Sequence, residues 1–494
     1  MDHATEVANP DTSVDSKGER TDLVYDAAGR LSKRISPKGV LSATVDDDAS
    51  LVEYDALDRV IRETDYGAGS SDKRVTHYCY DTAGDLRSVT APRAAVATVA
   101  CPGTGPLTGV GFTSSFDYDT AHRRVASRDP LGHETRLSYD ADGNVTVQDQ
   151  DIATGRVART TTGYDQRDRP VTITQRLDGA TGRDVTSRIE YDKNGNRSRT
   201  ISPRGNDAAG GSGTFANYVT VYDYDAANRL VRVSLPFDSR DGTERQYLHR
   251  AYDANGNMLW ASLPVTSSSA SSVGDGARTL ETYFDPGWIR TSDDPANPKL
   301  HYDYDALGQQ AGRTPERKDA PGTLDTSRRM LWQYFADGQL KVRKDAGGQA
   351  ETYSYDADNN LTGAASAAGL TDPAEQPLTS QISYTGFNEV AKVKSRKQGV
   401  ANWTFSDATY DADGNVTQRH ENGEEDAAGT QTKAPRTYQM TYDGADWLAT
   451  QLDLGTDSGC TGDQRIVNSF FATGWEKQRD TYRGGSGCTS DPTT

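Results

Sequence analysis

The heptapeptide YDADGNV occupies Tyr139–Val145 and recurs unchanged at Tyr410–Val416. Variants of it run along the whole chain, and in total 17 copies begin on an aromatic anchor residue. Neighbouring anchors lie 21 to 38 residues apart, about 28 on average, which indicates a repeat architecture. Positions are counted from the anchor, which is position zero. The anchors are Tyr25, Tyr54, Tyr80, Tyr118, Tyr139, Tyr164, Tyr191, Tyr224, Tyr252, Tyr283, Tyr304, Tyr334, Tyr355, Tyr384, Tyr410, Tyr442 and Phe470.

Position four determines the local backbone of each copy. It is Gly in ten copies and Asp, Asn or His in the other seven, with His122 as the single histidine. These residue types best tolerate a positive φ. Asp follows the anchor in 13 copies, and Asp is favoured at the first position of a type I turn. A type I turn followed by a left-handed residue is a three-residue hairpin loop with a bulge, so each copy predicts a β-hairpin.

This loop makes position zero pair with position six across the two strands. Position six is aliphatic or Met in 12 copies, so aromatic and aliphatic side chains are predicted to face each other. Such cross-strand pairs contribute roughly 0.2–1 kcal/mol each. A two-residue turn on Asp142-Gly143 would instead place the pair on opposite faces. At the far ends of the hairpins, Pro and Gly in Ser36–Gly39, Asp129–Gly132 and Ser202–Gly205 predict further turns.

The composition suits a thin sheet better than a thick core. Only 34% of the 494 residues are hydrophobic, and Tyr accounts for 25 of the aromatic residues. We predict an all-β fold, in which a continuous antiparallel hairpin strip curls into an open, hollow shell. The repeat array is expected over residues 22–483, with a partial or frayed N-terminal segment at 1–21 and a frayed tail at 484–494.

Several protein classes are not supported. No apolar run of 18 residues is present, so no membrane span is predicted. The N-terminal residues contain no apolar signal-peptide region. The net charge is −18 and basic residues form no cluster, so no nucleic-acid partner is predicted.

The copies YDAAGRL and YDADGNV, together with DPLGHETRLSYD at Asp129–Asp140, strongly resemble RHS, or YD-repeat, proteins. The resemblance covers residues 22–480 and implies a long sheet that spirals into a hollow shell. In bacterial polymorphic toxins and Tc-toxin C components, such a shell surrounds a C-terminal toxin. In teneurins it is a rigid extracellular scaffold. The self-cleaving Asp residues of the toxin-bearing members have no counterpart here, so none is carried over.

Motifs for catalysis are absent from the sequence. The seven His residues have no metal-ligand spacing, and neither HExxH nor GxSxG occurs. Asp140–Asn144 and Asp411–Asn415 resemble a calcium loop, but the late Glu and the ligand spacing are missing. We therefore predict no catalytic residue, no cofactor and no metal site, and no enzyme activity. A hydrolase with a β-propeller or β-helix fold is the weakest interpretation.

Four cysteines are disulfide candidates, namely Cys79, Cys101, Cys460 and Cys488. Four cysteines allow three connectivities. We favour the two local pairs, Cys79–Cys101 and Cys460–Cys488, in an extracellular or surface protein. Four unrelated thiols are the alternative.

Two functions remain in competition. The first is a non-catalytic shell segment of a secreted or surface protein, enclosing or presenting a toxin, an effector or another shell component encoded outside this chain. The second is an extracellular adhesion module that binds glycans or a surface protein. Trp288, Trp447 and Trp475 lie beside the turn position and are candidate surface contacts for the second function, or caps on the sheet edge.

Overall fold

The computed structural model describes residues 6–8, 20–42, 44, 47–99, 101, 111–153, 155–176, 183–206, 218–236, 245–285, 287–366, 378–455, 464–470 and 476–483. In this part of the chain 37 strands are present, and the helices are single short turns. They are α1 (Pro37–Leu41), α2 (Pro203–Asn206), η1 (Pro92–Ala94), η5 (Ala270–Ser272), η6 (Asp275–Ala277) and η7 (Thr326–Arg328).

Seventeen incoming strands end on the 17 aromatic anchors. They are β2 (Arg20–Tyr25), β4 (Ala49–Tyr54), β6 (Lys73–Tyr80), β8 (Thr113–Tyr118), β10 (Glu134–Tyr139), β12 (Arg156–Tyr164), β14 (Asp184–Tyr191), β16 (Val219–Tyr224), β18 (Tyr247–Tyr252), β20 (Arg278–Tyr283), β22 (Leu300–Tyr304), β25 (Met330–Tyr334), β27 (Ala350–Tyr355), β29 (Leu378–Tyr384), β31 (Trp403–Tyr410), β34 (Arg436–Tyr442) and β36 (Gln464–Phe470).

Each of the 17 returning strands begins at position six. They are β3 (Leu31–Ile35), β5 (Val60–Tyr66), β7 (Leu86–Thr90), β9 (Arg124–Arg128), β11 (Val145–Ala153), β13 (Pro170–Arg176), β15 (Arg197–Ile201), β17 (Leu230–Ser234), β19 (Met258–Ser262), β21 (Ile289–Asp293), β23 (Gln310–Arg317), β26 (Leu340–Lys344), β28 (Leu361–Ser366), β30 (Val390–Lys397), β32 (Val416–Glu425), β35 (Leu448–Asp453) and β37 (Glu476–Arg483). Three further strands, β1 (Glu6–Ala8), β24 (Ala320–Leu324) and β33 (Gln431–Lys433), complete the sheet.

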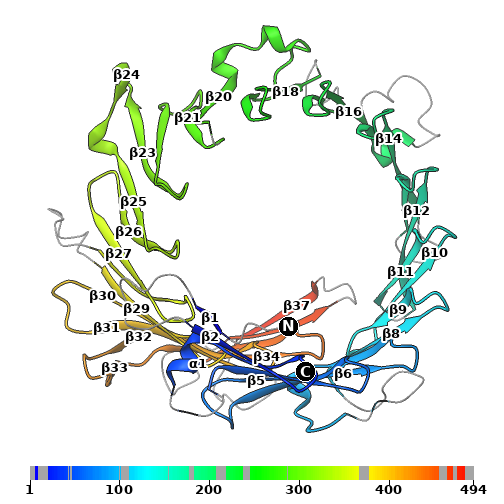
Figure 1. The fold of residues 1–494 in the computed structure, drawn as a ribbon, viewed down its shortest axis with the longest axis vertical. Helices are drawn as coiled ribbons and strands as arrows, with labels where there is room; N and C mark the ends of the chain where they lie inside the picture. Colours follow the sequence, from blue (N-terminus) through cyan, green and yellow to red (C-terminus); the bar gives the residue numbers. More distant parts are fainter. Residues whose placement is uncertain are drawn as a thin grey trace.

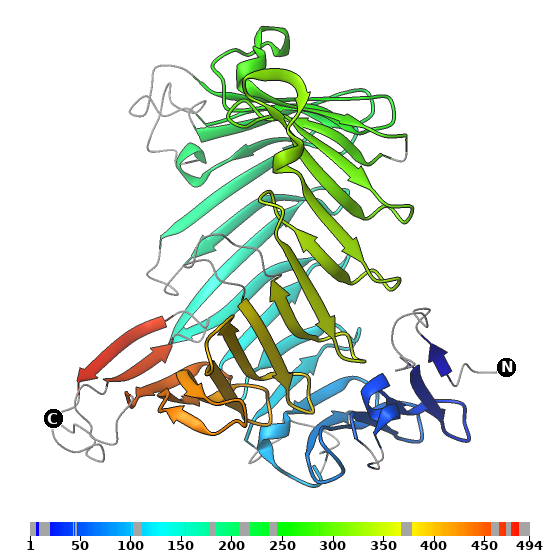
Figure 2. The ribbon, with the colours of Figure 1, turned by 90° about the vertical axis from the view of Figure 1, so that its left-hand side faces the viewer.

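The strands form one antiparallel strip in chain order. β24 and β33 belong to side hairpins, because β23 also pairs directly with β25 and β32 with β34. The strip curls into a ring around a central space, and its two ends overlap at the foot of the ring (Figure 1). The side view shows the strands crossing the wall obliquely (Figure 2). The predicted all-β, open and curled strip is therefore confirmed.

The turn geometry follows the sequence rule at every described copy. All 16 described position-four residues have positive φ, from 58° at Asp168 to 99° at Gly84. In the first copy the Asp26 amide donates to the Arg30 carbonyl at 2.9 Å, and the Gly29 amide donates to the Asp26 carbonyl at 2.9 Å. The Asp26 carboxylate also accepts from the Ala28 and Arg30 amides. The predicted three-residue loop is confirmed.

Position zero pairs with position six in all 17 copies, for example Tyr139 with Val145. The structure also shows a feature that was not predicted, a shift of the pairing register directly before each anchor. Ser138 pairs with Val147, so Thr146 at position seven has no opposite residue. An extra residue on one strand bends that strand and increases its twist. A bulge in every hairpin, added to ordinary sheet twist, explains why the strip curls.

The anchors join successive repeats through their hydroxyl groups. The Tyr164 hydroxyl donates to the Val145 carbonyl at 2.9 Å, which is position six of the preceding repeat. Twelve anchors make this bond, at 2.7–3.1 Å. Phe470 has no hydroxyl, and there the Asn468 amide donates to the equivalent Leu448 carbonyl. In these twelve copies the hydroxyl bond therefore links each anchor to the preceding repeat.

Position five supplies a second link between repeats. Five arginines at this position lie over the next anchor ring, with the guanidinium carbon 4.3–5.0 Å from the ring centroid. Four of the five Asn residues at this position donate to the side chain at position four of the next copy, as Asn144 does to Asp168 at 2.7 Å. Polar contacts therefore link many neighbouring repeats along the turn edge of the strip.

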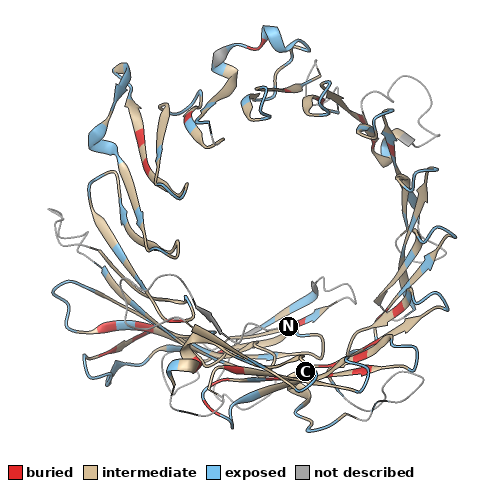
Figure 3. Ribbon diagram, viewed as in Figure 1, coloured by how far each residue is buried: buried red, intermediate tan, exposed pale blue. Residues whose placement is uncertain are grey.

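The wall is one sheet thick and has no apolar centre. Among the described residues more polar than apolar side chains are buried, and most residues are half-exposed along both sides of the wall (Figure 3). The turn predicted at Asp129–Gly132 is present, with Gly132 at φ 85°. The turns predicted at Ser36–Gly39 and Ser202–Gly205 are wrong in type, because the chain there makes single helical turns. Pro at the helix start and the Ser36 side-chain cap favour that conformation.

Replacing Gly143 by Val should destabilise the β10–β11 hairpin by about 1 kcal/mol or more, since a β-branched residue is strained at φ 93°. An added Cβ at Gly143 meets nothing within 4 Å, so the effect reports the backbone alone. Amide exchange of β10 and β11 measures it. The Gly143→Asn variant is the control and should lose less, because Asn occupies this position elsewhere. Equal effects for Val and Asn would contradict the left-handed assignment.

Replacing Tyr164 by Phe should cost about 1 kcal/mol, because it removes the hydroxyl bond to the preceding repeat. Tyr80 is the matched control. Tyr80 is an anchor of the same array, its ring lies under Arg59, and desolvation raises the pKa of its hydroxyl, but it is not among the twelve anchors that make the bond. Tyr80→Phe should leave local amide exchange nearly unchanged. Equal destabilisation of the two variants would show that the hydroxyl bond does not stabilise the array.

Candidate functional site: the seam of the shell

Four consecutive connections near the N-terminal end of the strip touch four consecutive repeat turns near its C-terminal end. We call this stacked contact the seam. Its hydrogen-bonded partners are mostly 315 to 322 residues apart in sequence. One superhelical turn therefore takes about 320 of the 494 residues. The connections are those after β3, β5, β7 and β9, and the repeat turns are those after β27, β29, β31 and β34.

The first seam contact involves α1 and the turn after β27. The Ser36 hydroxyl donates to the Asp358 carboxylate at 3.1 Å, and the Lys38 amide donates to the same carboxylate at 3.0 Å. Asp48 lies beside this contact, with only 6% of its side chain exposed and Lys38 Nζ at 3.5 Å. Burial, despite Lys38, raises the pKa of Asp48 to about 6, and the neighbouring Asp47 and Asp358 carboxylates add to the rise.

The second contact is an ion pair over an aromatic ring. Arg74 on β6 binds Glu389 at 2.7 Å, and both side chains are less than 20% exposed. The Arg74 guanidinium also lies 3.8 Å from the Phe387 ring centroid. The chains approach so closely here that a Cβ on Gly386 would meet Gly67 at 2.4 Å. Glycine at 386 therefore permits the stacking.

Arg93 makes the densest contact of the seam. Its guanidinium lies 3.2 Å from Asp411, 3.4 Å from Asp413 and 3.1 Å from Asp446. The same group donates to the Asp443 carbonyl, while the Arg93 amide donates to Asp413 at 2.9 Å. The Arg93 side chain is 14% exposed and that of Asp413 is 7% exposed. Burial raises the pKa of Asp413, so this carboxylate is held at a cost in its charged form.

The fourth contact brings His133 against Trp447, with ring centroids 6.2 Å apart and nearly parallel planes. His133 also binds Asp129 at 2.7 Å, in the turn after β9. An added Cβ on Gly444 would meet Leu131 at 3.0 Å, so the apolar tip of that turn packs here as well. Basic, aromatic and amide groups of the early connections thus meet carboxylates of the late turns.

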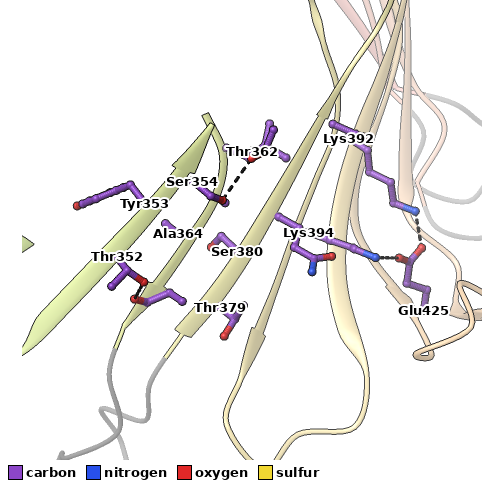
Figure 4. Close-up of a pocket in the computed structure, with 15 residues that line it drawn as sticks. Thr352, Tyr353, Ser354, Thr362, Ala364, Thr379, Ser380, Lys392, Lys394 and Glu425 are labelled. Carbon is purple, nitrogen blue, oxygen red and sulfur yellow. Dashed lines mark hydrogen bonds and ion pairs between the residues drawn. The ribbon is translucent and has the colours of Figure 1, made fainter. Parts of the chain in front are cut away.

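A second feature is an open trough of about 600 Å³ on β27–β30. Small and hydroxyl-bearing side chains line it, including Thr352, Ser354 and Thr379 (Figure 4). Lys392 and Lys394 lie at one end and both bind the buried Glu425. The trough therefore offers hydroxyl and amide groups, and its charged groups are already paired.

The described residues offer no evident site for chemistry. No group of three His, Cys, Asp or Glu side chains among them lies close enough to hold a metal ion. No helix in this part of the chain is long and apolar enough to cross a membrane. His122 forms a structural contact, with Nδ1 2.8 Å from Asp85 of the preceding repeat, which raises the His122 pKa.

The structure joins Cys79 and Cys101 in a disulfide, with Cα atoms 5.3 Å apart. Cys79 is buried at 2% exposure and Cys101 is exposed. Cys460 and Cys488 lie outside the described residues, so that pairing stays a prediction.

The candidate tryptophans occupy position five. Trp288 lies 5.3 Å from the next anchor, Tyr304, and Trp447 lies 5.5 Å from Phe470. Both are half-buried, so they replace the position-five arginines as packing on the next ring. Trp475 lies outside the described residues. Of the two roles that the sequence left open for Trp288 and Trp447, packing at the edge of the sheet fits these contacts better than a freely exposed surface contact.

Sequence reasoning missed the seam residues. Arg74 and Arg93 lie in a strand and a loop without a motif, and their partners are more than 300 residues away. Position five carried a detectable signal, since it is Arg, Asn or Trp in most copies.

Comparison with known proteins identifies the repeats. The family model described as RHS Repeat matches residues 118–157 and 334–371. These two segments therefore carry RHS repeats, as the resemblance in the sequence predicts. No curated protein matches its sequence. Among solved structures, the crystal structure of TcdB2-TccC3-TEV superposes with a TM-score of 0.52 at 14% identity, covering 94% of this chain and 23% of that one.

Two further solved structures resemble this chain. The crystal structure of TcdB2-TccC3 gives a TM-score of 0.47 at 13% identity, over 93% of this chain and 27% of that one. A Photorhabdus luminescens Tc holotoxin pore gives 0.46 at 13% identity, over 94% and 27%. The chain therefore spans about a quarter of the length of these structures. The superposition on TcdB2-TccC3-TEV, at a TM-score of 0.52, shows a shared fold alone.

The seam should be tighter in mild acid than at neutral pH. The pKa of Asp48 is raised to about 6 in the folded protein, so the folded state binds this proton more tightly than the unfolded chain. Stability should therefore rise as the pH falls through about 6 and level off near about 4. The Asp48→Asn variant should be more stable than the parent at about pH 8, by at most about 3 kcal/mol, and this difference should vanish near about pH 4.

Asn keeps the left-handed backbone at this site, where φ is 46°. Asp168→Asn is the matched control, with φ 58° and a position away from the seam. Unfolding free energies of the parent and both variants across this pH range measure the effect. The assignment would be contradicted if the parent lost stability on acidification through about pH 6 and the Asp48→Asn variant did not.

Proposed function

We propose that this chain is a non-catalytic structural segment of a shell, which encloses or presents a toxin or effector encoded outside it. The observation that supports the proposal is the ring of Figure 1, a single-layered wall whose ends stack at the seam. A compact enzyme would bury an apolar core, whereas here polar contacts between repeats hold a curved wall. The superhelical period of about 320 residues gives the chain roughly one and a half turns.

The polar wall fits a container better than a binding domain. A lumen that is not apolar would let a cargo chain remain inside without collapsing onto the wall. The net charge of −18 would also repel acidic cargo and attract basic cargo. We propose that the protein is secreted or displayed on a surface. The disulfide between Cys79 and the exposed Cys101 supports this location, because disulfides persist in oxidising environments.

The proposal is tested with an unfolded, protease-labile polypeptide fused after Thr494. A shell should slow digestion of this cargo compared with the free polypeptide. The control is the same fusion carrying Arg74→Met and Arg93→Met, which remove two seam contacts. Slower digestion in the parent than in the control supports enclosure. Equal digestion of parent fusion, control fusion and free polypeptide would contradict it.

The second candidate is an adhesion module that binds glycans. The hydroxyl-lined trough of Figure 4 is the observation that favours it. The tryptophans do not add support, since Trp288 and Trp447 pack within the array. Binding to a glycan array that is lost in Ser354→Leu, a change within the trough, would favour adhesion. If the protein binds no glycan on the array, a shell is the better explanation of its function.

A further inference from the structure

The residue at the centre of the seam is carried by a loop with few attachments. Arg93 belongs to η1 in the connection between β7 and β8. The backbone-to-backbone hydrogen bonds described for η1 are local, with the Ala94 amide donating to the Ala91 carbonyl and the Ala95 amide to the Pro92 carbonyl, while the Arg93 amide donates to Asp413 across the seam. The position of this loop therefore depends on what ties the connection to the sheet.

Three ties hold the described part of the connection to neighbouring strands. At its root the Ala91 amide donates to the Phe112 carbonyl at 2.9 Å. Further along, Nε2 of His77 donates to the Val96 carbonyl at 3.2 Å. Beyond that, the disulfide joins Cys101 to Cys79. The disulfide and the His77 bond both end on β6, so they hold the outgoing side of the loop against the same strand.

We propose that the Cys79–Cys101 disulfide is a redox-controlled latch on the seam, whose reduction frees the segment carrying Arg93 and loosens the stacked turns of the shell. This inference rests on the proposed function, because it names how that shell is regulated. An oxidised shell would stay closed outside the cell and would loosen in a reducing compartment that contains small thiols or dithiols.

The chemistry requires a thiol reductant and balances as two exchange steps. A thiolate attacks Sγ of Cys101, the exposed half of the bridge, and the electron pair of the S–S bond leaves on Sγ of Cys79. A second thiolate then attacks the reductant sulfur of the mixed disulfide and releases Cys101. The two reductant thiols are oxidised to one disulfide, the cystine gains two electrons, and the two protons pass to the cysteines.

Arg93 explains why freeing this loop would affect the far end of the chain. It contacts carboxylates of two successive repeat turns, Asp411 and Asp413 in one and Asp446 in the next. It also lies 4.3 Å from the Phe112 ring centroid, at the root of the same connection. Displacing the Arg93 side chain would therefore leave the carboxylates of Asp411, Asp413 and Asp446 without this cation, and the first two are largely buried.

The test compares amide exchange of the oxidised and thiol-reduced full-length protein, with non-reduced peptide mass spectrometry to establish the bridge. On reduction, turns Asp411–Asn415 and Asp443–Trp447 should exchange about tenfold faster or more, as expected when a covalent restraint on the contact is lost. Strands β12–β14, far from the seam, should not change. The Cys79→Ala variant combined with Cys101→Ser should show the fast exchange under both conditions.

Two matched variants separate this latch from other effects. Cys460→Ser with Cys488→Ser should keep the full response to reductant, because it leaves the Cys79–Cys101 bridge intact. Arg93→Met keeps the bridge and should give fast exchange at the seam even when oxidised. This variant shows whether Arg93 transmits the effect.

Three results would overturn the proposal. The first is free thiols at Cys79 and Cys101 in protein kept under air. The second is fast exchange confined to residues 91–101 with the late turns still protected. The third is an equal rise over the whole sheet, which would mark general destabilisation. Since the readout needs no cargo, failure of the latch is distinct from failure of enclosure, which the protease experiment measures.

Discussion

One residue with positive φ, four places after an aromatic anchor, is the constraint on which each hairpin depends. It turns the chain so that position six returns beside position zero, and all 17 copies show this pairing. The pairing places the anchor ring where its hydroxyl can reach the carbonyl of the preceding repeat. Twelve repeats are therefore held twice, once by their own turn and once by this bond to the preceding repeat. That local rule, repeated along the chain, produces a continuous wall.

The curvature of the wall brings distant residues together. A bulge at position seven in each copy adds bend to the ordinary twist of the sheet, and the accumulated rotation returns the strip upon itself after about 320 residues. At that point early connections stack on late repeat turns. The early connections bring Arg74, Arg93 and Lys38 to this contact. Of the acidic residues that they meet, Asp411 and Asp446 also occupy positions one and four of the hairpin loop, so residues that serve the local turn take part in a tertiary contact.

Much of the fold could be predicted from residue types because the deciding interactions are local. Gly, Asn, Asp and His at position four, for instance Gly143 and Asn228, report a left-handed backbone directly. The partner of Arg93 could not be predicted, since it depends on curvature summed over more than ten repeats. Ser36–Gly39 was misjudged because Pro and Gly suit both a turn and a helix start. For Trp288 and Trp447 the sequence left a surface contact and a cap on the sheet edge open, because it did not show that position five packs on the next ring.

A double-mutant cycle on Arg74 and Glu389 tests the central claim, that the two ends of the strip stack in solution. These side chains are 315 residues apart in sequence and 2.7 Å apart in the structure. Arg74→Met, Glu389→Gln and the double variant are compared by the opening free energy of the Thr385–Glu389 turn from amide exchange. The stacked shell predicts a coupling energy of roughly 1–3 kcal/mol for this partly buried pair. Additive effects, with no coupling, would mean that the seam does not form.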